Sequence, residues 1–424
     1  MVSPRKEWAR IRSNSLARNA SWMFFGRGLS IGFQALYFIL LARLLGSTEY
    51  GIYAGVVAMV GIVSIYAPLG SGLTLLRHIS PDHSKFAPYW GNALVTVLTL
   101  GSLFVGFLIW VVPLLAHSYS WRLVLCVAIG DCLCGQLTDV ASRVFMAFEK
   151  LRITASLILL TNLLRMVLAG LMLWRLHHAT AQQWVIAIVV VSFIGCCLAV
   201  TLVTRYYGKP SLSLRLLRQR TGEGFVYALS SSSAGIYNSF DKAMLGHYGM
   251  NAANGIYSMA YRVIDLCMIP IDSIHNAAFP RFFQKGVGGV QSTRAYARRI
   301  LRITAPIGLL LGACLFLAAP VVPHVVGKSF EGSVAALRWL CLLPVLRSLH
   351  YSAGDALTGA GHQNLRLGSQ VAVAAFNFGV NLYLIPQYGW LGAAWSSLAS
   401  DGLLAVFNWT VLLRVQAIER ASAA

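Results

Sequence analysis

The stretch Lys242-Ala-Met-Leu-Gly246, followed after a polar turn by Gly255-Ile-Tyr257, has a counterpart near the N-terminus. The earlier copy reads Ala42-Arg-Leu-Leu-Gly46 and, after a shorter turn, Gly51-Ile-Tyr53. The two copies lie 200 to 204 residues apart, which is close to half of the 424-residue chain. Internal repeats at half-length are typical of transporters that consist of two related bundles. The stretch therefore predicts a chain of two similar halves.

The composition is that of a membrane protein. Hydrophobic residues make up 57% of the chain and charged residues only 11%, whereas a soluble domain is about a quarter charged. Apolar runs of about 20 residues, long enough to cross a hydrocarbon core, recur along the chain. Because only helices satisfy their backbone hydrogen bonds within one such segment, the sequence predicts an all-α polytopic membrane protein.

We expect twelve transmembrane helices in two bundles of six. The predicted spans are 20–45, 50–76, 90–116, 121–148, 153–176, 182–204, 224–246, 253–280, 297–322, 334–357, 367–385 and 391–413. The expected organisation is a basic N-terminal tail (1–19), a six-helix bundle (20–205), a basic linker (206–222), a second six-helix bundle (223–414) and a C-terminal tail (415–424).

Lysine and arginine gather in every second loop and in both tails, for example around Arg77, Arg218 and Arg299. The alternate loops carry only Arg43, Arg122, Arg175 and Lys328. By the positive-inside rule, both termini and the basic linker are cytoplasmic, which requires an even number of spans. The net charge of +20 then reflects topology and contact with anionic membrane lipids. We expect no nucleic-acid partner.

The sequence predicts no metal site and no cofactor. All eight cysteines fall inside predicted spans, and no two have the spacing of a CxxC or zinc motif. His275 and His350 lie in spans without a carboxylate at metal-ligand spacing. A membrane-embedded glycan polymerase, ligase or acyltransferase is one alternative function, but such enzymes usually have a large outer loop or a buried histidine-centred site. The outer loops here are short, which favours a transporter over an enzyme.

Ionisable residues inside the spans are the candidates for function, because each costs about 2.5 kcal/mol or more to insert. Arg27, Lys242 and Arg262 are the predicted substrate-binding residues of a cavity. Asp265 and Asp272 are candidates for ion coupling.

Other buried charges have structural interpretations. Asp131 and Arg165 lie near the middle of consecutive spans, where we expect a structural ion pair. Asp241 and Lys242 lie near the end of a span, from which they can reach the interface by snorkelling. Arg262 and Asp265 are three residues apart on one helix and are expected to neutralise each other in part.

Several motifs resemble one family. Gly26-Arg-Gly-Leu-Ser30, Phe38-Ile-Leu-Leu-Ala-Arg-Leu-Leu-Gly46, Glu49-Tyr-Gly-Ile-Tyr53 and Pro68-Leu-Gly-Ser-Gly72 look like the N-terminal region of Wzx-type polysaccharide-biosynthesis flippases. The stretch from Asp241 to Tyr257 is similar to that family too. These flippases belong to the multidrug/oligosaccharidyl-lipid/polysaccharide (MOP) exporter superfamily, which also contains the MATE transporters and the lipid II flippases.

The resemblance implies a V-shaped cavity between two six-helix bundles, lined mainly by the first, second, seventh and eighth spans. It implies alternating access that carries an undecaprenyl-diphosphate-linked oligosaccharide, such as an O-antigen or lipopolysaccharide repeat unit, to the outer leaflet of a bacterial inner membrane. A polysaccharide polymerase is an expected partner. Arg27, Lys242 and Arg262 fall on the cavity spans, and arginine and lysine suit a diphosphate.

Two relatives within the superfamily are alternatives. Drug and cation antiporters of the MATE type are expected to carry an acid in the first span, yet residues 24–45 contain no Asp or Glu. Lipid II flippases usually have two further spans, for which the chain has no room. The identity of the glycan, the driving ion and the oligomeric state stay open.

Overall fold

The computed structural model describes the backbone of residues 4–423 and the side chains of residues 28–225, 227–229 and 239–421. The described elements are all helical: long α-helices, short 3-10 turns and one π-helical segment, η2 (Ile129–Gly135). The predicted all-α class is confirmed. The chain divides into two compact units.

The N-terminal unit contains Met1–Leu45 and Val56–Ser239. Its helices are α1 (Pro4–Ser64), α2 (Ser71–Ile79), α3 (Phe86–Leu115), α4 (Trp121–Ala128), α5 (Gln136–Ala147), α6 (Leu151–Leu176), α7 (Ala181–Tyr207) and the first part of α8 (Leu214–His247), with a 3-10 turn, η1 (His83–Lys85), before α3. Helix α1 is two helices joined at Gly46, whose φ of 67° lies in the left-handed region. A capping box of Thr180 and Gln183 starts α7.

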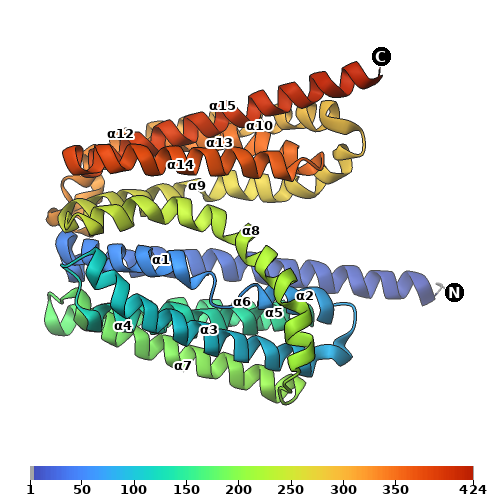
Figure 1. The fold of residues 1–424 in the computed structure, drawn as a ribbon, viewed down its shortest axis with the longest axis horizontal. Helices are drawn as coiled ribbons and strands as arrows, with labels where there is room; N and C mark the ends of the chain where they lie inside the picture. The colour runs from blue at the N-terminus through green and yellow to red at the C-terminus, as the bar shows by residue number, and fades with distance from the viewer. Residues whose placement is uncertain (1–3, 424) are drawn as a thin grey trace. The chain divides into compact units, whose positions relative to one another are not determined.

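The C-terminal unit contains Gly46–Gly55 and Phe240–Ala424. Its helices are α9 (Asn251–Gly286), α10 (Gly289–Ala318), α11 (Val322–Val326), α12 (Ser333–Leu340), α13 (Leu343–Gly359), α14 (Gln363–Tyr388) and α15 (Trp390–Ala423), with 3-10 turns η3 (Ala319–Val321) and η4 (Lys328–Phe330). Figure 1 shows α10, α13, α14 and α15 as one layered bundle, in yellow to red. The extensively packed α13 contacts α9, α10, α14 and α15.

Eight helical segments of the described chain are long and apolar enough to cross a membrane. The chain is therefore a multi-pass membrane protein, whereas the number twelve stays a prediction. Three features separate the numbers. Predicted span 334–357 is divided between the short helices α12 and α13, neither of which is among the eight. Predicted spans 20–45 and 50–76 appear as one segment, Gly28–Ser64. Helix α9, which carries many polar and charged residues, is not among the eight, and α8 lies only in part within the residues whose side chains the structure describes.

The two copies of the repeated sequence meet through their glycines. A Cβ atom on Gly51 would lie 1.8 Å from the carbonyl oxygen of Asn251, and one on Gly255 would lie 1.8 Å from that of Ser47. Only glycine permits this backbone approach. The Asn254 side chain reinforces it by donating to the carbonyls of Gly51, at 3.1 Å, and of Lys242, at 3.0 Å.

The linker between the predicted bundles is anchored to the N-terminal unit. The amide of Asn92 on α3 donates to the carbonyl of Ser213 at 3.0 Å, and Ser213 N–H donates to the Asn92 side chain at 3.0 Å. Glu223 on α8 forms ion pairs with Arg77 at 2.9 Å, His78 at 3.2 Å and Arg220 at 3.3 Å. Helix α8 begins at Leu214, so the last part of the predicted linker is helical.

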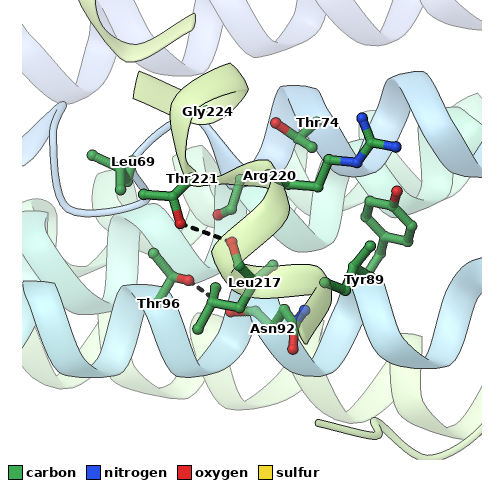
Figure 2. A pocket seen from close by; sticks show the side chains of 12 residues that line it. Leu69, Thr74, Tyr89, Asn92, Thr96, Leu217, Arg220, Thr221 and Gly224 are labelled. Carbon is green, nitrogen blue, oxygen red and sulfur yellow. Dashed lines mark hydrogen bonds between the residues drawn. The ribbon is translucent and has the colours of Figure 1, made fainter. Parts of the chain in front are cut away.

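A cavity of about 40 Å³ lies where this anchored part of α8 meets α2 and α3. Figure 2 shows hydroxyl groups around it, including Thr96, which donates to the Asn92 carbonyl at 2.8 Å, and Thr221, which donates to the Leu217 carbonyl at 2.7 Å. The Ser71 hydroxyl is buried and has no hydrogen-bond partner among the described residues. The cavity is large enough for a few water molecules, which suits hydration of this junction.

Candidate functional site

Asp241 on α8 is the centre of a buried hydrogen-bond network in the C-terminal unit. Its Oδ2 accepts from the Tyr257 hydroxyl at 2.6 Å and the Ser397 hydroxyl at 2.8 Å, and its Oδ1 accepts from the Asn381 amide at 2.7 Å. Asp241 is only 4% exposed. The expectation that it snorkels to the interface is therefore wrong, because three donors from three other helices satisfy the carboxylate inside the unit.

The network continues along α14 and α15. The Asn381 amide also donates to Asn377 at 2.9 Å, Asn377 donates to Ser400 at 3.1 Å, and the Ser396 hydroxyl donates to the Asn381 carbonyl oxygen. Asn377 and Asn381 are four residues apart and share one face of α14. The sequence contained this signal, a pair of amides at helical spacing in an apolar span, together with the serines of α15.

A cluster of cations lies beside this network. The Tyr261 ring has the Lys242 ammonium 5.0 Å from its centroid and the Arg347 guanidinium at 5.7 Å, both within cation–π range. Arg262, the next residue of α9, is a hydrogen-bond partner of the Tyr50 hydroxyl. The cluster thus joins α8, α9 and α13 with residues 46–55, which include part of the first copy of the repeat.

Arg347 holds two carboxylates. Its Nη1 lies 3.4 Å from Asp265 Oδ1, and its Nε lies 3.5 Å from Asp401 Oδ2. Arg262 and Asp265 interact electrostatically, as their spacing of three residues predicts. The ion pair of Asp265, however, is with Arg347 on another helix. Sequence spacing could not show this, because Arg347 lies 82 residues away from Asp265.

The other predicted site residues have different positions. The side chain of Arg27 lies outside the described residues. Asp131 is in η2 and feels the charge of Arg165, yet within the described side chains the two form no ion pair shorter than 4.0 Å. Asp272 is partly buried on α9, within the field of Arg347 and His275. The structure thus brings together Lys242, Arg262 and Asp265, and it adds Arg347 and Asp401.

The surroundings of the cations indicate which of them a ligand can reach. Lys242 and Arg262 are partly exposed, and the Asp265 side chain is 49% exposed, whereas Arg347 and Asp401 are buried. Buried ion pairs hold Arg347 in place, which leaves Lys242 and Arg262 at the accessible side of the cluster. Two cations next to aromatic rings suit an anionic group with several oxygens, such as a diphosphate.

Comparison with known proteins identifies the family of this chain. The family model described as "Polysaccharide biosynthesis protein" matches residues 16–285. A curated relative is 22% identical over 406 residues, covering 93% of this chain and 82% of the relative. It is the "Probable low-salt glycan biosynthesis flippase Agl15" of Haloferax volcanii.

Solved structures of the MOP superfamily share the fold. An inward-facing multidrug resistance MATE family transporter has a TM-score of 0.72 at 17% identity, covering 92% of this chain and 96% of that one. A MOP superfamily transporter from Pyrococcus furiosus Vc1 has a TM-score of 0.65 at 16% identity, with 95% and 96% covered. The MATE multidrug transporter DinF-BH has a TM-score of 0.65 at 16% identity, with 94% and 95% covered.

The fold is therefore that of a MOP superfamily membrane transporter, and the relatives indicate a transporter rather than an enzyme. Within that class, the chain belongs to the polysaccharide biosynthesis protein family. The resemblance of its sequence motifs to the flippases of this family is confirmed.

Proposed function

We propose that this protein is a flippase that moves an undecaprenyl-diphosphate-linked oligosaccharide from the inner to the outer leaflet of a bacterial inner membrane by alternating access. Its family membership supports a role in polysaccharide biosynthesis. The description of the Haloferax relative as a glycan biosynthesis flippase supports a lipid-linked glycan as the substrate class. The repeat unit of a surface polysaccharide, for example an O-antigen of lipopolysaccharide, fits this class, and a polysaccharide polymerase is the expected partner.

The observation that carries the proposal is the cation cluster of Lys242, Arg262 and Arg347 around Tyr261 and Tyr50. A diphosphate carries its charge on several oxygens, and guanidinium groups bind such oxygens in pairs. In a low-dielectric setting these contacts are stronger than in water. The sugar and the lipid differ among substrates of this class, whereas the diphosphate is shared, so a fixed cation cluster suits recognition of the common group.

The test is a double variant, Lys242→Gln with Arg262→Gln, in cells that lack the native protein. We expect the lipid-linked glycan to accumulate on the cytoplasmic leaflet and the surface glycan to fall at least tenfold, because the diphosphate loses both accessible cations. The matched control is Arg122→Gln with Arg175→Gln, which removes two cations that each lie over a tryptophan ring in the N-terminal unit. This control should transport as the wild type does.

Two outcomes would contradict the proposal. Normal surface glycan in the Lys242/Arg262 variant, at wild-type protein level, would exclude the cluster as the diphosphate site. Unchanged leaflet distribution in cells without the protein, combined with ion-driven dye efflux by the protein, would instead indicate a drug or cation antiporter of the same superfamily.

A further inference from the structure

The N-terminal unit has its own set of charged residues within membrane helices, which the diphosphate site of the C-terminal unit does not use. Asp131 lies in η2, Asp139 and Arg143 lie in α5, and Arg165 lies near the middle of α6. Asp139 and Arg143 pair at 2.7 Å. Asp131 feels the charge of Arg165, yet the described side chains contain no ion pair between them, and the buried Arg165 Nε has no hydrogen-bond partner among them. Charges at membrane depth that the protein leaves unpaired are candidates for binding a ligand.

The continuous helix formed by α4, η2 and α5 has a polar exposed side. Between Leu123 and Arg143, where the structure describes every residue, only Gly135 and Asp139 are exposed. A helix that faced lipid would expose apolar residues instead, whereas polar residues in a span face the interior or a water-filled space. A Cβ atom on Gly135 would meet only the carbonyl oxygen of Gly130 in the same helix, at 3.2 Å. No other helix therefore covers Gly135, which lies about one turn from Asp131.

Helix α6 has a matching polar face. Thr154, Thr161 and Arg165 are spaced seven and four residues apart and share this face. It is not fully covered, because Ile158, which precedes Arg165 by seven residues, is 50% exposed. Helices α5 and α6 are in contact, and the Thr154 hydroxyl donates to the Ser142 carbonyl at 3.4 Å. The other side of α6 exposes the apolar residues Leu160, Val167, Leu171 and Trp174.

The charges on these two faces favour a neutral ligand with many hydroxyl groups. We call Asp131, Asp139, Arg143, Thr161 and Arg165 the polar track. Its two carboxylates and two guanidinium groups give it no net charge. A phosphate would be repelled by the carboxylates, and a cation would be repelled by the guanidinium groups. A hydroxyl group meets neither conflict, because it can donate to a carboxylate and accept from a guanidinium, and such charge-assisted hydrogen bonds are the strong ones. Sugars carry several hydroxyl groups on one small ring.

We propose that the polar track binds the sugar part of the lipid-linked glycan, with Asp131 accepting from sugar hydroxyls and Arg165 donating to sugar oxygens. This inference rests on the proposed flippase function and assigns a site to the part of the substrate that the cation cluster does not hold. Asp131 and Asp139 are eight residues apart, a rise of about 12 Å along the helix, so the track offers polar contacts along its length. Because the track has no net charge, we expect it to favour uncharged sugars over acidic ones.

The test measures binding of two lipids to purified protein in nanodiscs by native mass spectrometry. One is the lipid-linked glycan extracted from cells that lack this protein, and the other is undecaprenyl diphosphate without sugar. We expect the wild type to bind the glycan lipid at least tenfold more tightly. Asp131→Asn with Arg165→Gln removes both charges together, and it should lose this preference while its affinity for undecaprenyl diphosphate is unchanged. Asp82→Asn with Lys85→Gln removes an exposed ion pair of the same unit, at 3.1 Å, and is the matched control that should bind both lipids as the wild type does.

The two lipids separate the two proposals. Wild-type protein that binds both lipids equally tightly overturns the sugar site and leaves the flippase proposal intact. An Asp131/Arg165 variant that keeps the wild-type preference for the glycan lipid overturns the sugar site as well. Wild-type protein that binds neither lipid contradicts the flippase proposal. Thr161→Leu is the second variant if the double variant misfolds. The Thr161 hydroxyl donates to the Leu157 carbonyl of its own helix at 2.8 Å, so leucine adds bulk one turn from Arg165 without breaking a contact to another helix, and we expect the same loss of preference.

Discussion

At Asp241 a single side chain holds four helices together, because its two oxygens accept from residues on α9, α14 and α15. We predict that Asp241→Asn lowers the unfolding free energy by about 1–3 kcal/mol, the cost of leaving a buried donor unpaired. The amide has one accepting oxygen, so the three donors of the native site cannot all be satisfied. Thermal unfolding in detergent, followed by tryptophan fluorescence, measures the change.

Asp139→Asn is the matched control for this prediction. Asp139 has a side chain that is 50% exposed, and it pairs with Arg143 one helical turn away, an arrangement that contributes little to stability. We expect this variant to unfold within a degree or two of the wild type. Equal melting temperatures for the two Asp→Asn variants would show that the Asp241 network does not stabilise the C-terminal unit.

The Arg347–Asp401 pair gives a second prediction at the residue scale. The two side chains are 11% and 4% exposed. Removal of Arg347 leaves the buried Asp401 without its arginine, and removal of Asp401 leaves the buried Arg347 with only the half-exposed Asp265 as counterion. Arg347→Gln and Asp401→Asn should each destabilise the protein by about 3–5 kcal/mol. The double variant should lose clearly less than the two single losses combined, because each substitution removes the buried charge that the other leaves unpaired. Additive losses, measured by the same unfolding assay, would rule out a direct coupling between these residues.

Between elements, the backbones of the two repeat copies approach closely at Gly51 and Gly255. We predict that Gly51→Ala destabilises the protein by about 1–3 kcal/mol or more, because the new Cβ would lie 1.8 Å from the Asn251 carbonyl oxygen and backbone must move. Gly61→Ala is the control in the same helix, since a Cβ there meets no atom within 4 Å. A Gly51→Ala protein as stable as Gly61→Ala would contradict this packing.

The anchor of α8 gives a pH-dependent prediction. Burial opposes ionisation of Glu223, yet the hydrogen bond and charge of His78 and the charges of Arg77 and Arg220 outweigh it and lower the Glu223 pKa below the ordinary 4.5. A lowered carboxyl pKa contributes stability above pH 4.5, and this contribution is lost as pH falls through the lower, folded-state value.

Hydrogen exchange of the backbone amides of residues 211–224 measures the state of this anchor. We expect exchange there to be slow at pH 6 and to accelerate in Glu223→Gln, whose neutral amide cannot pair with the two arginines. As pH falls through the lowered pKa of Glu223, wild-type protein should approach the behaviour of the variant, after correction for the intrinsic pH dependence of exchange. No difference between wild type and variant at pH 6 would mean that Asn92 and Ser213 alone hold the segment.

At the scale of the whole molecule, hydrophobic runs and the repeat were sufficient to predict the fold class. A helix that crosses the lipid needs a long apolar segment, and such segments can be read directly from the sequence. Only part of the candidate site could be predicted from the sequence. Lys242, Arg262 and Asp265 stand out as charges in apolar spans, but their partners Arg347 and Asp401 are distant in sequence and become neighbours only through packing. Helical spacing predicted that Asp265 would interact with Arg262 on the same helix. In the structure, Asp265 forms its ion pair with Arg347 of α13, which packing brings next to it.

The orientation of the chain in the membrane is a prediction for the whole molecule, and it rests on the distribution of lysine and arginine among the loops. The alternation of basic loops predicts that residues 208–212, 287–289 and both tails are cytoplasmic, and that residues 117–120, 177–180 and 327–332 are outside. Single cysteines at these positions, in a chain whose eight native cysteines are replaced by alanine or serine, can be labelled in intact cells with a membrane-impermeant maleimide. Only the second group should react before lysis. Labelling of Ser211→Cys, but not of Ser329→Cys, would invert the topology. The lipid diphosphate that we propose as substrate would then have to enter the site from the opposite leaflet.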